Sequence, residues 1–125
     1  MIIDTDVLIW YLKGNQKAYQ FVESQLGFNI SVVTYIELVQ GMRNKHELNV
    51  FRNQFRNWNA KIIHINEEIS AKAMFYIERN YLSHSLQLAD ALIGSTGLVH
   101  GMPIATGNDK HYKVISELEV IKVKI

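Results

Sequence analysis

Short apolar segments alternate along the chain with longer stretches whose apolar residues recur at helical spacing. The short segments predict buried strands over residues 1–4, 28–33, 61–65, 103–106 and 119–125. The helical stretches predict helices over residues 6–13, 16–26, 45–58, 66–81 and 86–100, one starting at residue 34, and a short one after residue 107. Because strands and helices alternate, we expect an α/β fold with a mainly parallel central sheet and helices on both faces. No linker or repeat interrupts the pattern, so we expect a single domain over residues 1–125.

Polar residues mark where several of these helices should begin. Thr34, with Glu37 three residues later, matches a capping box and places a helix start at Thr34. Asn66 is a typical N-cap residue for the helix predicted over residues 66–81. A polar connection over residues 83–85 precedes the apolar helix that contains Asp90.

Composition and charge limit the classes of protein that need to be considered. The chain has no cysteine and no apolar run long enough to span a membrane, so we expect a soluble, cytoplasmic protein without thiolate metal sites. The net charge of +1 does not by itself favour a nucleic acid partner. One stretch is locally basic, with a single acid, Glu47, among five cations: Arg43, Lys45, Arg52, Arg56 and Lys61. This stretch is either a solvated helix face or a phosphate-binding surface.

The acidic residues fall where a parallel sheet would bring them together. Asp4 ends the first predicted strand, Glu37 begins the helix after the second, and Asp109 follows the fourth. The carboxyl ends of parallel strands share one edge of the sheet. Asp90 lies in the first turns of a helix that leads into a strand, and such helices also begin at that edge. We therefore expect the four groups to lie on one rim.

Asp90 is the most informative of these acids, because it is the only formally charged residue between Arg79 and Asp109. A carboxylate in such an apolar segment needs a compensating cation. Gly94 and Gly97 share its helical face, and we interpret them as open space beside the carboxylate. Oxygen ligands without cysteine or histidine suit Mg²⁺ or Mn²⁺ rather than zinc.

The resulting hypothesis is a metal-dependent hydrolase. Asp4, Glu37 and Asp90 would hold Mg²⁺, which would activate a water molecule for in-line attack on a phosphodiester. A single-stranded or looped RNA is the expected substrate, because unpaired segments can bend into a shallow acidic groove.

Each acid also has a purely structural alternative. Asp4 or Asp6 would serve as the N-cap of the first helix, and Glu37 as the acidic member of its capping box. Asp90 would pair with a distant arginine or favour the helix N-terminus. Asp109 would be the N-cap of the short helix that follows it. His111 and Tyr112 lie in the same turn, and neither is assigned a catalytic role.

Four segments, MIIDTDVLIWYL, SVVTYIEL, LADALIGSTGL and IATGNDKHY, resemble in order and separation the PIN domain, and specifically the VapC-type toxins of toxin–antitoxin pairs. The resemblance covers nearly the whole chain. It implies a PIN-like three-layer fold and an Mg²⁺-dependent endoribonuclease. It also implies a homodimer and a small cognate antitoxin whose tail covers the active site.

Residue by residue, the resemblance assigns the family's three clearest acids to Asp4, Glu37 and Asp90. In the last motif the family commonly places Asp or Asn two residues after the threonine, which is Asn108 here, and another polar or acidic residue at His111. Asp109 falls between them, so the fourth ligand is Asn108, Asp109 or a water held by either, and one or two metals remain open. Two further residues are assigned supporting roles: Thr106 and Asp6.

Three other functions are compatible with parts of the sequence. A degenerate PIN fold would bind RNA or protein without cleaving. A phosphatase of the haloacid-dehalogenase type would use Asp4 and Asp6 as its D-x-D pair, but such enzymes need a larger scaffold and leave Asp90 unexplained. A receiver-like binding module would need an aspartate on its central strand, and residues 7–89 contain none.

Overall fold

The chain folds around a five-stranded sheet in which every neighbouring pair is parallel, in the order β3-β2-β1-β4-β5. The computed structural model describes residues 1–83 and 86–125. The strands are β1 (Ile2–Ile3), β2 (Asn29–Ser31), β3 (Lys61–Ile63), β4 (Ile104–Thr106) and β5 (Val120–Lys122). All five predicted strands are present, each shorter than predicted, and the α/β prediction is confirmed.

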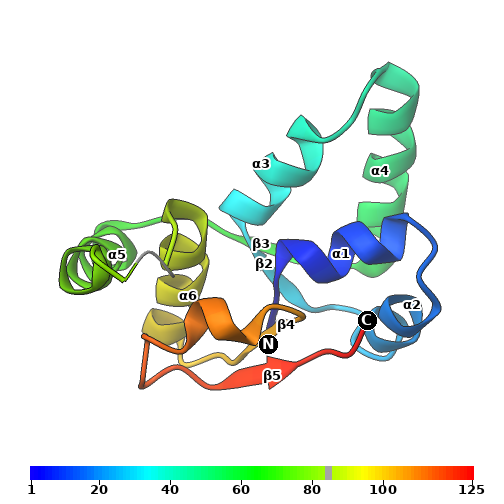
Figure 1. Ribbon diagram of the computed structural model, residues 1–125. Helices are drawn as coiled ribbons and strands as arrows, with labels where there is room; N and C mark the ends of the chain where they lie inside the picture. Colours follow the sequence, from blue (N-terminus) through cyan, green and yellow to red (C-terminus); the bar gives the residue numbers. More distant parts are fainter. Residues whose placement is uncertain (84–85) are drawn as a thin grey trace.

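Helices cover both faces of the sheet. They are α1 (Thr5–Leu12), α2 (Gln16–Glu23), α3 (Val32–Gln40), α4 (Lys45–Trp58), α5 (Glu67–Asn80) and α6 (Leu88–His100), with a 3₁₀ turn η1 (Asp109–Tyr112). Figure 1 shows α5 and α6 on one side and α1 and α2 on the other, while α3 and α4 rise together away from the sheet. None of the helices in the described ranges is long and apolar enough to cross a membrane.

Both faces of the central strand β1 are buried. Ile2 packs into the cluster beneath α5 and α6, whereas Ile3 packs into the cluster beneath α1, α2 and α4. Both side chains are fully buried, as the alternating pleat of a strand requires when helices cover both faces. On β4, Ile104 and Ala105 alternate between the same two clusters.

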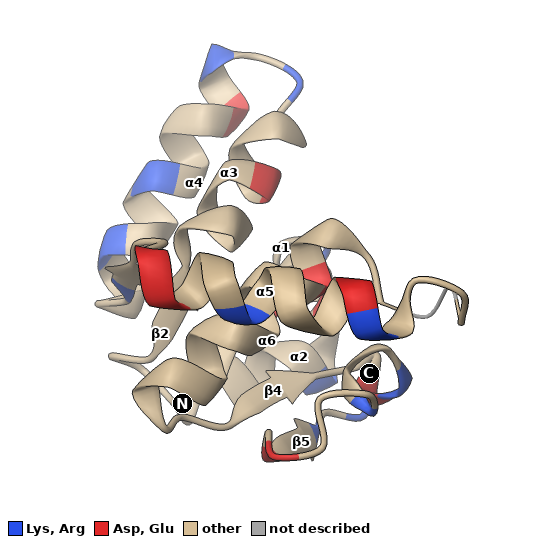
Figure 2. Ribbon diagram, turned by 90° about the vertical axis from the view of Figure 1, so that its left-hand side faces the viewer, with Lys and Arg blue, Asp and Glu red and all other residues tan. Residues whose placement is uncertain are grey.

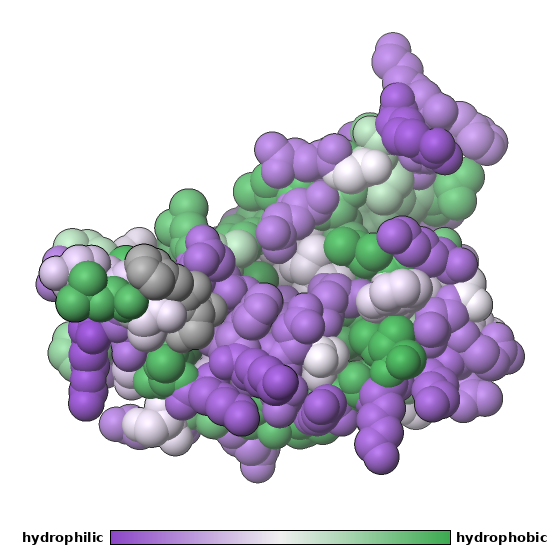
Figure 3. Space-filling view, in the orientation of Figure 1, coloured by the Kyte–Doolittle hydropathy of each residue, from purple (hydrophilic) through white to green (hydrophobic). Residues whose placement is uncertain are grey.

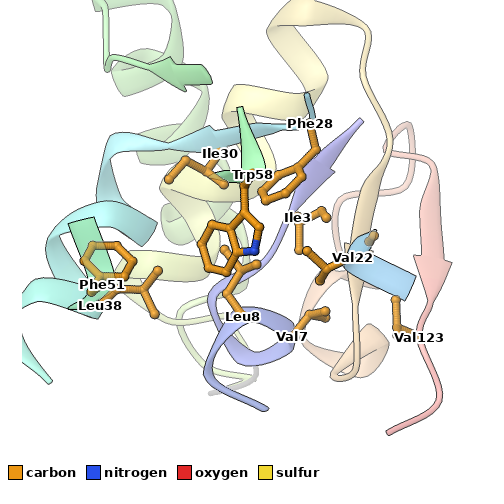
Figure 4. Packing of buried hydrophobic residues seen from close by; sticks show 11 residues of the cluster. Ile3, Val7, Leu8, Val22, Phe28, Ile30, Leu38, Phe51, Trp58 and Val123 are labelled. Atoms are coloured by element: carbon orange, nitrogen blue, oxygen red, sulfur yellow. The ribbon is translucent and has the colours of Figure 1, made fainter. Parts of the chain in front are cut away.

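The larger aromatic residues fill the cluster on the α1 and α2 side. Trp58 and Phe51 lie seven residues apart on α4, and both point inward from it (Figure 4). Trp58 packs on Phe28 with ring centroids 5.7 Å apart. This spacing of two helical turns is the periodicity that predicted the helix over residues 45–58, and its bounds are confirmed.

The prediction that a helix starts at Thr34 is wrong. Helix α3 begins at Val32, and the Ser31 hydroxyl caps it by accepting a 3.1 Å hydrogen bond from the Val33 amide. Thr34 therefore lies inside the helix and is fully buried. The β-branched pair Val32–Val33 suggested a strand, but a serine at the strand end supplies the cap and packing overrides weak propensity.

Other helix boundaries differ less. Helix α1 begins at Thr5 with Asp4 as its N-cap, and Asn66 caps α5 as predicted, accepting from the Ile69 amide at 2.9 Å. Helix α2 ends at Glu23 and α6 begins at Leu88, so both are shorter than predicted. Of the predicted polar connection, residues 84–85 lie outside the described residues.

The interpretation of Gly94 and Gly97 as open space beside Asp90 is also wrong. A Cβ at Gly94 would lie 2.6 Å from Ile115 Cδ1 and 3.2 Å from Tyr112 Cδ1. A Cβ at Gly97 would lie 2.8 Å from Ile104 Cδ1 and from the Met102 carbonyl oxygen. These glycines let α6 approach its neighbours closely, which brings Tyr112 against the helix that carries Asp90.

We predict that Gly97→Ala lowers the free energy of unfolding by about 1–3 kcal/mol, because the added methyl group overpacks a site bounded partly by backbone. Urea denaturation measures this loss. Gly41→Ala is the matched control, because its Cβ would meet nothing closer than 3.4 Å and should change stability little. Equal effects of the two substitutions would contradict the close-packing role.

Candidate active site

Asp4 sits where the two central strands end. Its Oδ1 accepts a 2.8 Å hydrogen bond from the Thr5 amide as the N-cap of α1, and its Oδ2 accepts a 2.8 Å bond from the Thr106 hydroxyl. Thr106 is the last residue of β4, which pairs directly with β1. The Asp4 side chain therefore joins adjacent strand ends at the carboxyl edge of the sheet. Asp4 therefore both caps α1 and lies at the predicted edge of the sheet.

Asp6 ties the loop after β4 to the first turn of α1. Its Oδ2 accepts a 3.0 Å hydrogen bond from the Gly107 amide, and its Oδ1 lies 3.4 Å from the Thr106 hydroxyl oxygen. A Cβ at Gly107 would lie only 2.8 Å from Asp6 Oδ2, so a side chain at this position would displace the Asp6 carboxylate. Asp6 thus shares Thr106 with Asp4.

The two carboxylates form a region of uncompensated negative charge. Burial, together with the charge of Asp6, raises the pKa of the Asp4 carboxyl to about 6, although the Thr106 hydrogen bond opposes the shift. Burial also raises the pKa of Asp6. No lysine or arginine in the described ranges pairs with either group. Such a pair of acids suits a bound cation.

Glu37 reaches the same rim through a neighbour of Asp4. It lies in the second turn of α3, and its Oε1 accepts a 2.7 Å hydrogen bond from the Thr5 hydroxyl. The Thr5 oxygen is also 2.9 Å from the Thr34 hydroxyl. The sequence analysis assigned neither threonine to the site, because only the fold places these buried hydroxyls beside an acid.

Asp90 is the third residue of α6, as predicted for a residue in the first turns of that helix. It forms a capping box with Gln87, whose amide donates to Asp90 Oδ2 at 3.3 Å. Its side chain is 16% exposed, and His111 Nδ1 lies 3.4 Å from Oδ2. The alternative of a distant arginine partner is not supported, because no arginine within the described residues forms an ion pair with Asp90. A histidine that sequence reasoning left without a role faces Asp90 instead.

The turn η1 places Tyr112 among the acids. Its side chain is fully buried, and its hydroxyl forms no hydrogen bond of standard geometry within the described residues. Burial raises the pKa of Tyr112, and the charges of Asp4, Asp90 and Asp6 raise it further. His111 also interacts electrostatically with Asp6. Asp4, Asp6 and Asp90 therefore surround one turn, contributed by the motif that follows β4.

Asp109 is turned toward a different partner. Its Oδ1 lies 3.7 Å from Lys122 Nζ, and Asn108, not Asp109, is the N-cap residue of η1. The alternative of Asp109 as an N-cap is therefore wrong. Asn108 is exposed, and its backbone N–H donates a 3.0 Å hydrogen bond to the Thr106 hydroxyl.

The described side chains share a rim without forming a finished metal site. Within residues 1–83 and 86–125, no three His, Cys, Asp or Glu side chains are placed to hold one metal ion. Thr106 links Asp4 with Asp6, Thr5 holds Glu37, and His111 faces Asp90. Figure 3 shows hydrophilic residues gathered in the middle of this face, between α6 and α1 and below α3. Glu37 and Asp90 would have to rotate to meet Asp4.

Most of the locally basic stretch lies away from Asp4 and Asp6, whereas Arg43 lines a pocket together with Glu37. Figure 2 shows lysines and arginines along α4 and at the α3–α4 connection, on the part of the molecule that rises from the sheet, whereas Lys61 begins β3. Arg43 pairs with Glu47 at 2.8 Å, and the arginines on α4 are exposed. This arrangement favours the solvated helix face over a phosphate-binding surface.

Three comparisons relate the chain to known proteins. A model of the PIN domain matches residues 1–117. "Ribonuclease VapC10" of Mycobacterium tuberculosis is 32% identical over 125 residues, which cover 95% of this chain and 90% of that protein. "Ribonuclease VapC1" of Methanocaldococcus jannaschii is 28% identical, covering 94% and 82%. A chain of a toxin–antitoxin complex from Klebsiella pneumoniae superposes with a TM-score of 0.82 at 25% identity, covering 98% and 97%.

We predict that the metal-free protein loses stability as the pH rises through the pKa of Asp4. Because the folded-state pKa is about 6 and the ordinary pKa of an aspartate is 3.8, protonated Asp4 favours the folded state, and this contribution is lost as the pH rises through about 6. In EDTA, the drop in unfolding free energy between pH 5 and 7.5 should be about 1 kcal/mol larger for wild type than for Asp4→Asn. Urea denaturation at both pH values measures it, and identical drops would contradict the assigned pKa.

Proposed function

This chain belongs to the PIN domain family, and we propose that it is a VapC-type ribonuclease, the toxin of a toxin–antitoxin pair. The family resemblance of the four sequence motifs is confirmed by the match over residues 1–117. Two similar proteins are named as ribonucleases, at 28% and 32% identity over most of the chain. The observation that carries the proposal is the buried Asp4 carboxylate, held by Thr106 beside Asp6 without a basic partner in the described residues.

The proposed site holds a divalent cation, Mg²⁺ or Mn²⁺. Asp4, Glu37 and Asp90 are the proposed ligands, with Asp6 as a supporting acid. When bound, the ion supplies Lewis acidity and positive charge for phosphodiester hydrolysis. The raised pKa of Asp4 supports this assignment, because a nearby cation would favour its ionised form.

The remaining residues of the rim orient these ligands. Thr106 donates to Asp4 and accepts from the Asn108 amide, so it fixes the carboxylate against the loop after β4. Thr5 donates to Glu37 Oε1 at the edge of the cluster, and Glu37 would turn away from it to bind the ion. His111 holds Asp90 Oδ2 and would move aside in the same way.

RNA is the proposed substrate and a small antitoxin the proposed partner. The partner is supported by structural similarity to a chain of a toxin–antitoxin complex from Klebsiella pneumoniae at 25% identity. The cytoplasmic location and the homodimer remain predictions. The exposed side chains Met74 and Phe75 on α5 are compatible with a dimer contact.

A non-cleaving PIN domain is the second candidate, and one observation favours it. The acids within the described residues are not placed around a single metal position. Binding of RNA without Mg²⁺-dependent cleavage would support this candidate. The phosphatase alternative is disfavoured, because the PIN domain model matches residues 1–117 of the chain.

We predict that the protein cleaves a mixed RNA pool with Mg²⁺, that EDTA abolishes cleavage, and that Asp90→Asn lowers the rate at least about 100-fold. Gel analysis of end-labelled RNA measures the rates. Glu78→Gln, an exposed acid on α5, is the matched control and should cleave like wild type. Unchanged cleavage by Asp90→Asn would rule out the proposed site, and hydrolysis of p-nitrophenyl phosphate would support a phosphatase.

We propose Asn108 as the fourth ligand of the metal ion. It lines a pocket together with Asp6, whereas Asp109 pairs with Lys122. Asn108→Ala should lower the cleavage rate about tenfold or more, and Asp109→Asn less than about threefold. The same RNA assay compares the two variants. A larger loss of rate in Asp109→Asn than in Asn108→Ala would assign the role of fourth ligand to Asp109.

A further inference from the structure

A pocket opens beside the acid cluster, between α1 and the C-terminal end of the chain. Its volume is about 420 Å³, and Asp6 and Asn108 form the wall that it shares with the candidate active site. The lining also includes one aromatic side chain, Trp10, and two lysines, Lys122 and Lys124. A volume of this size lies in the range of small-molecule sites. In Figure 1 the C-terminus lies close to α1 and α2.

Trp10 is an unusual residue to find exposed at this position. It lies four residues after Asp6 on α1, so the two side chains occupy the same face of the helix. Its neighbours Val7 and Leu8 are fully buried, whereas Trp10 is 44% exposed. The Lys13 ammonium lies 5.4 Å from the centre of its ring. The indole therefore presents an aromatic surface to the pocket instead of filling the core.

Positive charge surrounds this indole. Lys124 is exposed and forms no ion pair within the described residues, and Lys122 is 58% exposed beside Asp109. The two lysines of the lining, Lys122 and Lys124, outnumber its single acidic side chain, Asp6. The acids of the active site repel a polyanion, so a strand of RNA needs a nearby region of opposite charge to remain bound.

We propose that this pocket binds one nucleotide of a single-stranded RNA next to the scissile phosphate. Its base stacks on Trp10, and its phosphates lie at Lys124 and Lys122. Stacking on an exposed aromatic residue beside lysines is how single strands are held without dependence on sequence. The inference rests on the proposed function, because it names the subsite through which the same active site holds its substrate.

The two tryptophans of the chain make the pocket directly observable. Trp58 is fully buried, so quenching of fluorescence by RNA must come from Trp10. Titration of the protein in EDTA with random-sequence RNA decamers should quench wild type. Trp10→Phe should bind within about threefold of wild type without the quench, because phenylalanine still stacks. Trp10→Ala should bind about 5- to 100-fold more weakly by fluorescence anisotropy of labelled RNA.

The charge of the pocket is tested separately. Lys124→Gln should lower RNA affinity and reduce the slope of log affinity against log salt by about 0.7, the value for one lost phosphate contact on a single strand. Lys72→Gln, an exposed lysine on α5, is the matched control and should leave both unchanged. Circular dichroism confirms that each variant is folded.

The outcomes separate this inference from the proposed function. If wild type cleaves RNA and Trp10→Ala cleaves it with the same KM, the pocket does not bind substrate and the nuclease assignment stands. If wild type cleaves no RNA but RNA quenches Trp10, the pocket inference stands and the nuclease assignment fails. Unchanged RNA affinity in both Trp10→Ala and Lys124→Gln overturns the inference and leaves the pocket to a protein partner.

Discussion

The hydrogen bond between the Thr106 hydroxyl and Asp4 joins the ends of the two central strands, and the arrangement of the rim follows from it. Because β1 and β4 are parallel neighbours, the residues that follow them emerge side by side. Asp4 then caps α1, and the same helix turn carries Thr5 toward Glu37 and Asp6 toward Gly107. One short contact thus connects segments 102 residues apart in sequence and sets the position of three acids.

The electrostatic cost of this arrangement explains its chemistry. A carboxylate that is only 6% exposed, with a second acid two residues away, is destabilised in its charged form, as the raised pKa of Asp4 shows. Hydroxyl and amide donors offset part of that cost, but no lysine or arginine in the described ranges does. Charge neutralisation from outside the chain, by a cation, is the physical reason for expecting a site here.

Close packing around α6 is the second constraint on the rim. Gly94 and Gly97 have no room for a side chain, and Tyr112 is pressed against the helix by the turn η1. This packing places His111 beside Asp90 and the Tyr112 ring among the acids. The glycines that seemed to leave space for a metal ion instead bring the loop after β4 onto the helix that carries Asp90. Sequence spacing predicts which residues share one face of a helix, but it does not predict which segment packs against that face.

The sequence alone determined the order of strands and helices and most of their positions, because alternation and helical periodicity depend on local spacing. It also placed Asp4 at a strand end and Asp90 in a first helical turn. The tertiary structure alone decided that Ser31, not Thr34, caps α3, that Thr5 holds Glu37, and that Asp109 faces Lys122. Those contacts depend on how whole helices and loops pack, and residue order carries no local signal of that.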